Sequence, residues 1–215
     1  MKRFIYFVAT VMAALSLSSC SDDDWDYDKS LEHEYFITPK LWGYDKPGAA
    51  SGVGSNNCVF YDVNQGETVA VPMEFHSAFD RNYDVTTYYW TAPKPDGEKY
   101  IDKLNKYTND DLIAYEGPEL VRGVDYEVVD AKGNVLTPGA DGAFKLEWPH
   151  ALAGVQNIYI KALPGGKKGS FNVQTVSPEA PTPSASEVST TYQYETKQFA
   201  VRIVSYNYRV TINVR

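Results

Sequence analysis

Cysteine, histidine and basic residues are scarce in this 215-residue sequence, which has two Cys and three His. Two cysteines are too few for a disulfide scaffold. There are 20 Lys and Arg against 28 Asp and Glu, so the net charge is −8. Because that charge repels phosphate and no basic cluster offsets it, we expect no nucleic-acid binding. Hydrophobic residues make up 43% of the chain, enough for one domain with its own core.

Motifs for catalysis are also missing. His33, His76 and His150 do not form a His-Glu-x-x-His zinc motif, and no Gly-x-Ser-x-Gly nucleophile motif occurs. Carboxylates are numerous in predicted turns, so a glycosidase with two opposed carboxylates is kept as a less favoured alternative. Loop carboxylates also leave Ca²⁺ binding open, although no Asp-x-Asp-x-Asp-Gly loop is found. We therefore predict a protein that is not an enzyme, with no assigned metal site and no cofactor.

The one long hydrophobic run lies at the N-terminus. Two basic residues precede an apolar run over residues 4–17, which is too short to span a bilayer comfortably and is typical of a secretory signal. The sequence Leu-Ser-Ser-Cys at residues 17–20 resembles the lipobox of bacterial lipoproteins, which implies cleavage before Cys20 and lipidation of its thiol. Residues 1–19 are thus a predicted lipoprotein signal peptide. An ordinary secretory signal followed by an incidental cysteine is the alternative.

Residues 20–34 form a predicted acidic tether. Three aspartates follow closely after Cys20, and this charged, poorly packing composition indicates a solvated spacer. An acidic run after a lipidated cysteine also resembles the surface-export signal of Bacteroidetes lipoproteins. That resemblance implies a lipid anchor in the outer membrane with the domain facing the cell exterior. The periplasmic face of the same membrane is the alternative.

Beyond the tether, apolar and polar residues alternate with a period of two, which is typical of half-buried β-strands. The clearest cases are residues 69–75, 144–148 and 171–175. Turn-forming sequences rich in Gly, Pro and Asn separate the strand-like runs. Further predicted strands lie within residues 58–63, 85–91, 126–130, 155–163 and 198–215. Eight or nine strands at regular spacing predict an all-β fold, a single β-sandwich over residues 35–215.

Three segments depart from this pattern. Apolar residues recur at helical spacing near residues 98–115, which predicts a short helical insertion. Residues 177–191 are rich in Ser, Pro and Thr and are predicted to form a long crossing loop. In the last segment, Val201 and Ile203 are apolar at odd positions, whereas Val210 and Ile212 are apolar at even ones. Since one straight strand would expose half of these side chains, we favour a terminal hairpin over a single bent strand.

One internal motif resembles a known family. Gly-Val-Asp-Tyr at residues 123–126, followed by the predicted strands, resembles the Gly-x-Asp-Tyr core of Calx-beta-like sandwich domains, particularly those of Bacteroidetes lipoproteins encoded with glycan-uptake systems. The resemblance covers residues 58–176 and implies an immunoglobulin-like sandwich. In calcium-binding members, acidic loops at one end of the sandwich hold the metal. Asp125 matches the motif, but no paired downstream acidic ligands are recognisable, so the resemblance supports the fold more than a Ca²⁺ site.

Aromatic residues are the remaining candidates for a site. Tyr88, Tyr89 and Trp90 place rings on both faces of one predicted strand, so at least one ring must be exposed or covered by a loop. Trp42 and Tyr100 lie in loop-like sequence. Because exposed aromatic rings can stack on the apolar faces of sugars, Trp42, Trp90 and Tyr100 are predicted ligand-binding residues. The alternative is that the aromatic residues are structural, as we expect for Trp148 and Tyr126, which lie at core positions of the alternating pattern.

These patterns together predict a lipid-anchored, cell-surface binding or accessory module that takes part in glycan capture by a polysaccharide-utilisation system. The expected partners are the membrane, through the lipid on Cys20, a polysaccharide and an outer-membrane uptake complex. An adhesion or structural module that contacts protein or matrix is the main alternative.

Overall fold

The computed structural model describes residues 33–39, 60–93, 118–181, 183, 191–204 and 208–215. These residues belong to a compact unit that begins at His33. The predicted signal peptide, Cys20, Trp42, Tyr100 and the predicted helical insertion lie outside the described residues. Within the described ranges, no helix has the length and apolar character needed to span a bilayer.

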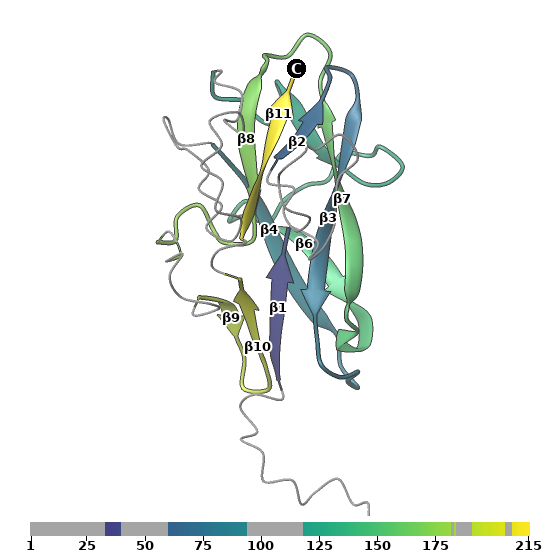
Figure 1. Cartoon of the computed structure of the whole chain (residues 1–215), viewed down its shortest axis with the longest axis vertical. Coiled ribbons are helices and arrows are strands. Elements are labelled where there is room, and N and C mark those ends of the chain that lie inside the picture. Colours follow the sequence, from purple (N-terminus) through teal and green to yellow (C-terminus); the bar gives the residue numbers. More distant parts are fainter. Residues whose placement is uncertain (1–32, 40–59, 94–117, 182, 184–190, 205–207) are drawn as a thin grey trace, which may run out of the picture. The chain divides into compact units, whose positions relative to one another are not determined.

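Six strands form one sheet, in the order β5-β7-β3-β1-β10-β9 (Figure 1). Neighbouring strands are antiparallel except β1 and β10, which are parallel. The strands are β1 (Glu34–Thr38), β3 (Thr68–His76), β5 (Tyr126–Val129), β7 (Gly154–Ala162), β9 (Tyr192–Glu195) and β10 (Ala200–Ile203).

A second sheet has five strands in the order β2-β11-β8-β4-β6. Here β2 and β11 are parallel and the other neighbours are antiparallel. A short 3-10 helix, η2 (Pro149–Ala151), follows β6. The strands are β2 (Phe60–Val63), β4 (Val85–Pro93), β6 (Phe144–Trp148), β8 (Gly169–Gln174) and β11 (Arg209–Val214).

The strand order is immunoglobulin-like. Strands β1, β3 and β7 lie side by side as A, B and E do in an immunoglobulin domain, and β4, β8 and β11 lie as C, F and G do. The predicted all-β sandwich is therefore confirmed. The described part of the chain holds eleven strands rather than eight or nine, because the short strands β1 and β9 do not stand out in the sequence.

The core lies between the two sheets. Alternate residues of β3 point inward, and Val71, Met73 and Phe75 are fully buried there. Trp148 of β6 stacks on Phe75, with ring centroids 4.8 Å apart, so aromatic packing joins the five-stranded sheet to the six-stranded one. The buried Nε1 of Trp148 donates to Thr87 Oγ1 at 2.8 Å, which satisfies the indole donor inside the core.

The C-terminal segment is not a hairpin. Strand β10 lies in the six-stranded sheet and β11 in the five-stranded sheet, so the prediction of a terminal hairpin is wrong. Val201 and Ile203 reach the core from one sheet, whereas Val210 and Ile212 reach it from the other. The change from odd to even apolar positions accompanies this crossing between sheets.

Candidate functional site

A cavity of about 290 Å³ is the best candidate for a site in the described part of the chain. It lies on the outer face of the five-stranded sheet, beside the turn that follows β8. It combines polar side chains from two strands with proline and alanine from the turn. The described residues that line it are Ala92, Pro93, Asn172, Gln174, Val176, Ser177, Pro178, Ala180, Pro183, Tyr208 and Arg209.

The floor of the cavity comes from β8 and β11. Phe171 and Val173 of β8 point into the core, so Asn172 and Gln174 project from the opposite face of the sheet. Across the ladder, Gln174 is paired in register with Arg209 of β11. The floor therefore presents two amides and a guanidinium group at neighbouring positions.

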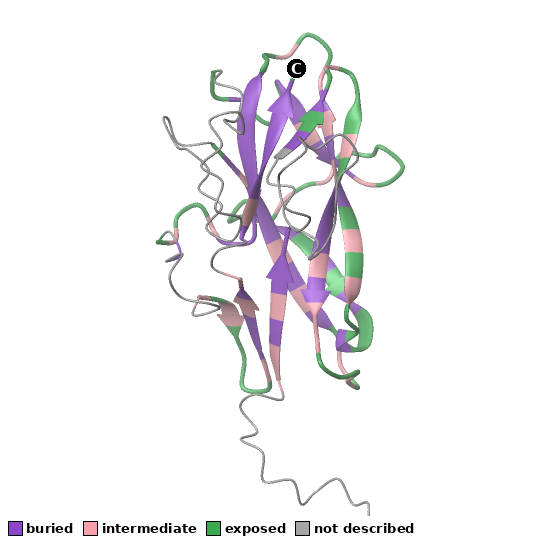
Figure 2. Cartoon of the chain, in the orientation of Figure 1, coloured by how far each residue is buried: buried purple, intermediate pink, exposed green. Residues whose placement is uncertain are grey.

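The outer face of these two strands continues as a row of buried polar side chains. Figure 2 shows that β8 and β11 are buried along almost their whole length. Thr211 Oγ1 donates to Asn172 Oδ1 at 3.0 Å, and Ser170 Oγ donates to Asn213 Oδ1 at 2.8 Å. Asn213 Nδ2 in turn donates to Asp62 Oδ1 at 2.9 Å. Because buried polar groups must be hydrogen-bonded to be tolerated, this face is built for polar contacts.

One wall is the turn after β8, which begins the predicted Ser/Pro/Thr-rich loop. Gln174 Nε2 donates to the carbonyl oxygen of Val176 at 2.8 Å, and the N–H of Ala180 donates to the carbonyl oxygen of Ser177 at 3.0 Å. Pro178 and Pro183 also line the cavity, and proline has a fixed φ and no N–H to satisfy. The wall therefore offers a stiff apolar surface opposite the polar floor.

Tyr208 and Arg209 form the other side. The Arg209 guanidinium carbon lies 5.1 Å from the centre of the Tyr208 ring, which is within the range of a cation–π contact. The backbone oxygen of Tyr208 accepts from the N–H of Thr175 at 2.8 Å and from its hydroxyl at 3.2 Å. These bonds tie the strand that carries Arg209 to the start of the opposite wall.

Of the predicted aromatic site residues, only Trp90 is described. It lies on β4 in register with Gln174, but its side chain is only 7% exposed, and Nε1 donates to the carbonyl oxygen of Asp141 at 3.2 Å. Tyr89 is in the core, and the Tyr194 ring on β9 packs edge-on against Tyr88 with ring centroids 5.7 Å apart. Trp42 and Tyr100 lie outside the described residues, so the platform of three aromatic residues stays a prediction.

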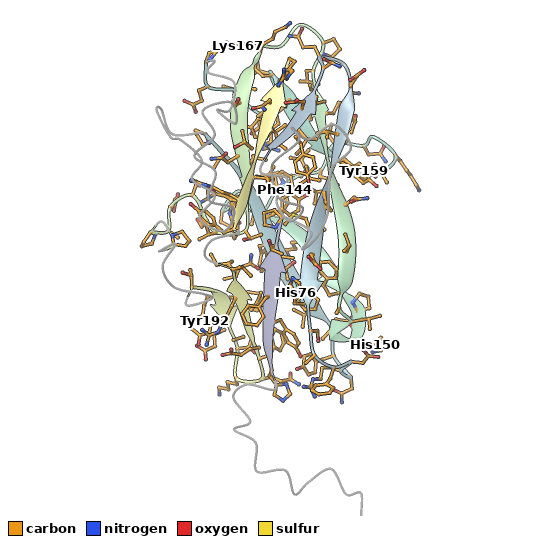
Figure 3. All side chains as sticks on the ribbon, in the orientation of Figure 1. His76, Phe144, His150, Tyr159, Lys167 and Tyr192 are labelled. Atoms are coloured by element: carbon orange, nitrogen blue, oxygen red, sulfur yellow. The ribbon has the colours of Figure 1, made fainter. Side chains whose placement is uncertain are left out.

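Asp125, from the Gly-x-Asp-Tyr motif, organises two turns. Its buried carboxylate accepts from the N–H of Lys167 at 2.7 Å and from the N–H of Val121 at 2.8 Å. The bond from Lys167, and then that from Val121, hold the pKa of Asp125 below its usual value. Lys167 lies at the opposite end of the sandwich from His150 (Figure 3). In the described ranges, no three His, Cys, Asp or Glu side chains are gathered in a way that could hold a metal ion.

Gln174, Tyr208 and Arg209 are not among the site residues predicted from the sequence. One signal was available: Asn172 and Gln174 are polar on a strand directly before the Ser/Pro/Thr-rich segment. Their closeness to Arg209, however, depends on the pairing of β8 with β11, which joins segments more than thirty residues apart. No protein-family model matches the chain, and no curated protein matches it.

Proposed function

We propose that this protein is a non-catalytic binding module that holds a sugar unit of a glycan in the cavity beside β8 and β11. One observation carries the proposal: a floor of amide and guanidinium groups faces a wall of proline and alanine. A sugar ring presents hydroxyl groups around its rim and C–H groups on its faces. The polar floor suits the hydroxyls, and the apolar wall suits the faces. The volume is near the lower end for ligand pockets, about 300 Å³.

The chemistry of the lining favours binding over hydrolysis. Hydrolysis of a glycosidic bond takes two carboxylates on either side of the bond. Among the described lining residues none is Asp, Glu, His or Cys, and the one charged side chain is Arg209. A guanidinium group can donate to sugar hydroxyls but cannot serve as a general acid or base near neutral pH.

The location is part of the same proposal. It is supported by the lipobox-like residues 17–20 and the acidic segment after them. The lipid on Cys20 would anchor the chain in the outer membrane, and the predicted tether, which the structure limits to the residues before His33, would hold the sandwich away from the bilayer, facing the cell exterior. A polysaccharide captured there would pass to an outer-membrane uptake complex, as the resemblance to lipoproteins encoded with glycan-uptake systems implies.

The test is binding to a panel of polysaccharides by affinity gel electrophoresis, followed by calorimetry with oligosaccharides of any polysaccharide that retards the protein. Ala180→Phe fills the cavity without removing a buried hydrogen-bonding partner and should weaken binding at least about tenfold. Glu179→Phe adds the same ring at the neighbouring exposed residue and should change affinity less than about twofold. Trp42→Ala tests the predicted aromatic platform in the same assay.

Two outcomes would contradict the glycan proposal. If the wild-type protein retains no polysaccharide, or if Ala180→Phe and Glu179→Phe bind alike, the cavity is not a glycan site. Location is tested separately by treating intact cells with protease. Loss of the sandwich supports surface display, and full protection places the domain on the periplasmic face.

A second function, adhesion to protein, has one observation in its favour. Phe79 and Leu152 are 64% and 54% exposed on the turns after β3 and η2. The N–H of Arg81 donates to the carbonyl oxygen of His150 at 2.7 Å, which joins these two turns. Exposed apolar patches can mark protein contacts, and these two joined turns each carry one exposed apolar side chain. Phe79→Ser with Leu152→Ser should then abolish attachment to a protein or matrix partner and leave polysaccharide binding unchanged.

A further inference from the structure

The side chain of Gln193 on β9 connects three backbone positions. Its Oε1 accepts from the N–H of Tyr88 at 2.8 Å. Its Nε2 donates to the carbonyl oxygen of Tyr88 at 2.7 Å and to that of Thr175 at 2.8 Å. A single amide thus satisfies both backbone groups of one β4 residue and one backbone group beside the cavity wall.

This arrangement fills a gap in the five-stranded sheet. The β4–β8 ladder has Trp90 opposite Gln174 as its last pair, and β8 ends there. Tyr88 is the next β4 residue whose backbone groups point toward the β8 side. It has no partner on β8, because the chain after β8 has turned away into the cavity wall. The amide of Gln193 has the same donor and acceptor groups as a peptide unit, so it takes the place of the missing strand residue.

A second contact fixes β9 in this position. The Tyr194 hydroxyl donates to the carbonyl oxygen of Thr86 at 2.6 Å. Its ring contacts both Tyr88 and Phe199, with centroids 5.7 and 6.0 Å away. Because β9 belongs to the six-stranded sheet and β4 to the other, the β9–β10 hairpin is attached across the sandwich at two successive residues.

The hydrogen bonds continue from Gln193 to the cavity. Thr175 is fully buried, and while its carbonyl oxygen accepts from Gln193, its N–H and hydroxyl donate to the backbone of Tyr208. Thr175 is followed at once by Val176 and Ser177 of the wall, and Tyr208 lies on the other side of the cavity. The amide of Gln193 therefore holds Thr175. Thr175 in turn connects the wall that follows it to Tyr208 on the other side of the cavity.

We propose that Gln193 is a positioning residue for the cavity: by holding Thr175, it sets the separation between the wall at residues 176–180 and Tyr208. The consequence for glycan affinity rests on the proposed function, whereas the effect on Thr175 does not. The β9–β10 hairpin and the cavity then act as one unit, and a ligand that fills the cavity should also stabilise the docked hairpin.

The test compares Gln193→Met with Gln198→Met in the full-length protein. Methionine keeps the length and volume of glutamine but has no amide, and Gln198 is an exposed residue of the same hairpin. Hydrogen exchange should show the Tyr88 and Thr175 amides losing at least about tenfold of their protection in Gln193→Met only. Affinity for the polysaccharide that the wild type binds should fall about fivefold or more in the same variant.

A pH-dependent rescue separates positioning from general stability. Gln193→Glu keeps the acceptor for Tyr88 but points a carboxylate at two carbonyl oxygens at neutral pH. When protonated, the same side chain has an O–H donor again. Thr175 protection in Gln193→Glu, relative to wild type at the same pH, should therefore recover as the pH is lowered toward 4, whereas Gln193→Met should show no such recovery.

The outcomes separate the two proposals. Unchanged Thr175 protection in Gln193→Met overturns the positioning role whether or not a glycan binds. Lost protection with unchanged affinity also overturns it, because the cavity would then not depend on Thr175. If the wild type binds no polysaccharide, the proposed function fails, and Thr175 protection alone decides the role of Gln193.

Discussion

Gly166 lies directly against the backbone of Asp125. A Cβ atom at Gly166 would come within 2.8 Å of the Asp125 Cα and 3.0 Å of its carbonyl oxygen. That oxygen also accepts from the N–H of Leu163 at 2.9 Å. The turn after β7 and the turn before β5 thus touch backbone to backbone, and only glycine leaves room for the contact.

Gly166→Ala should lower the free energy of unfolding by about 1–3 kcal/mol, because both contacting atoms are backbone and cannot move aside cheaply. Urea denaturation measures the change. Gly154→Ala is the matched control, since a Cβ at Gly154 has no neighbour within 4 Å. An effect no larger in Gly166→Ala than in Gly154→Ala would show that the two turns can separate without cost.

Asp125→Asn should destabilise the protein in a pH-dependent way. The carboxylate accepts two backbone N–H groups, and removing its charge should cost roughly 2 kcal/mol near neutral pH. Because the pKa of Asp125 is lowered in the folded state, this contribution is fully present above the ordinary pKa of 3.8. It is lost as the pH falls below that value, through the lowered pKa.

Urea denaturation of wild type and Asp125→Asn between about pH 2 and pH 7 should therefore show two stabilities that converge at the acid end. Asp80→Asn, at an exposed turn residue, controls for the loss of one negative charge. A difference between wild type and Asp125→Asn that is constant over the whole range would contradict the assigned hydrogen bonds.

The contributions of Trp148 and Thr87 to the free energy of unfolding should be strongly coupled. Trp148→Phe removes the donor to Thr87 Oγ1 and leaves that hydroxyl buried without its partner, at a cost of about 1–3 kcal/mol beyond the lost packing. Thr87→Val leaves the indole N–H without its partner in the same way. The double variant should be less destabilised than the sum of the two single variants, and simple additivity in this double-mutant cycle would refute the coupling.

His150 has a left-handed backbone conformation, with φ 56° and ψ 24°. Its N–H donates to Asp84 Oδ1 at 2.8 Å, which holds the turn in place. A β-branched residue fits this conformation poorly, so His150→Val should cost about 1–3 kcal/mol, whereas His150→Asn should cost much less. Thermal unfolding distinguishes them, and equal melting temperatures for the two variants would mean that this conformation carries no strain.

Alternation of apolar residues was enough to predict the sandwich core. Val71, Met73 and Phe75 alternate in the sequence and are buried on one face of β3. The alternation of apolar and polar residues within one strand, however, does not indicate which sheet that strand joins. For this reason the change of parity after Ile203 could be noticed, but it could not be assigned to a crossing between sheets.

The cavity was harder to predict than the fold. Its floor needs Gln174 beside Arg209, and its wall needs Thr175 held by Gln193; both relationships join residues far apart in the chain. For Trp90, the burial of the side chain was equally hard to predict. Its position on a strand was predicted, but its burial depends on neighbours such as Asp141, which sequence spacing does not place.

The first and last strands of the described sandwich, β1 and β11, both lie inside a sheet and not at its edge. Strand β11 lies between β2 and β8, so the five-stranded sheet cannot close until residues 209–214 have been synthesised. The parallel pairs β1–β10 and β2–β11 join the beginning of the domain to its end, a topology that slows folding. We therefore expect the sandwich to fold only after β11 has emerged from the ribosome, so the strands made earlier wait for their partner.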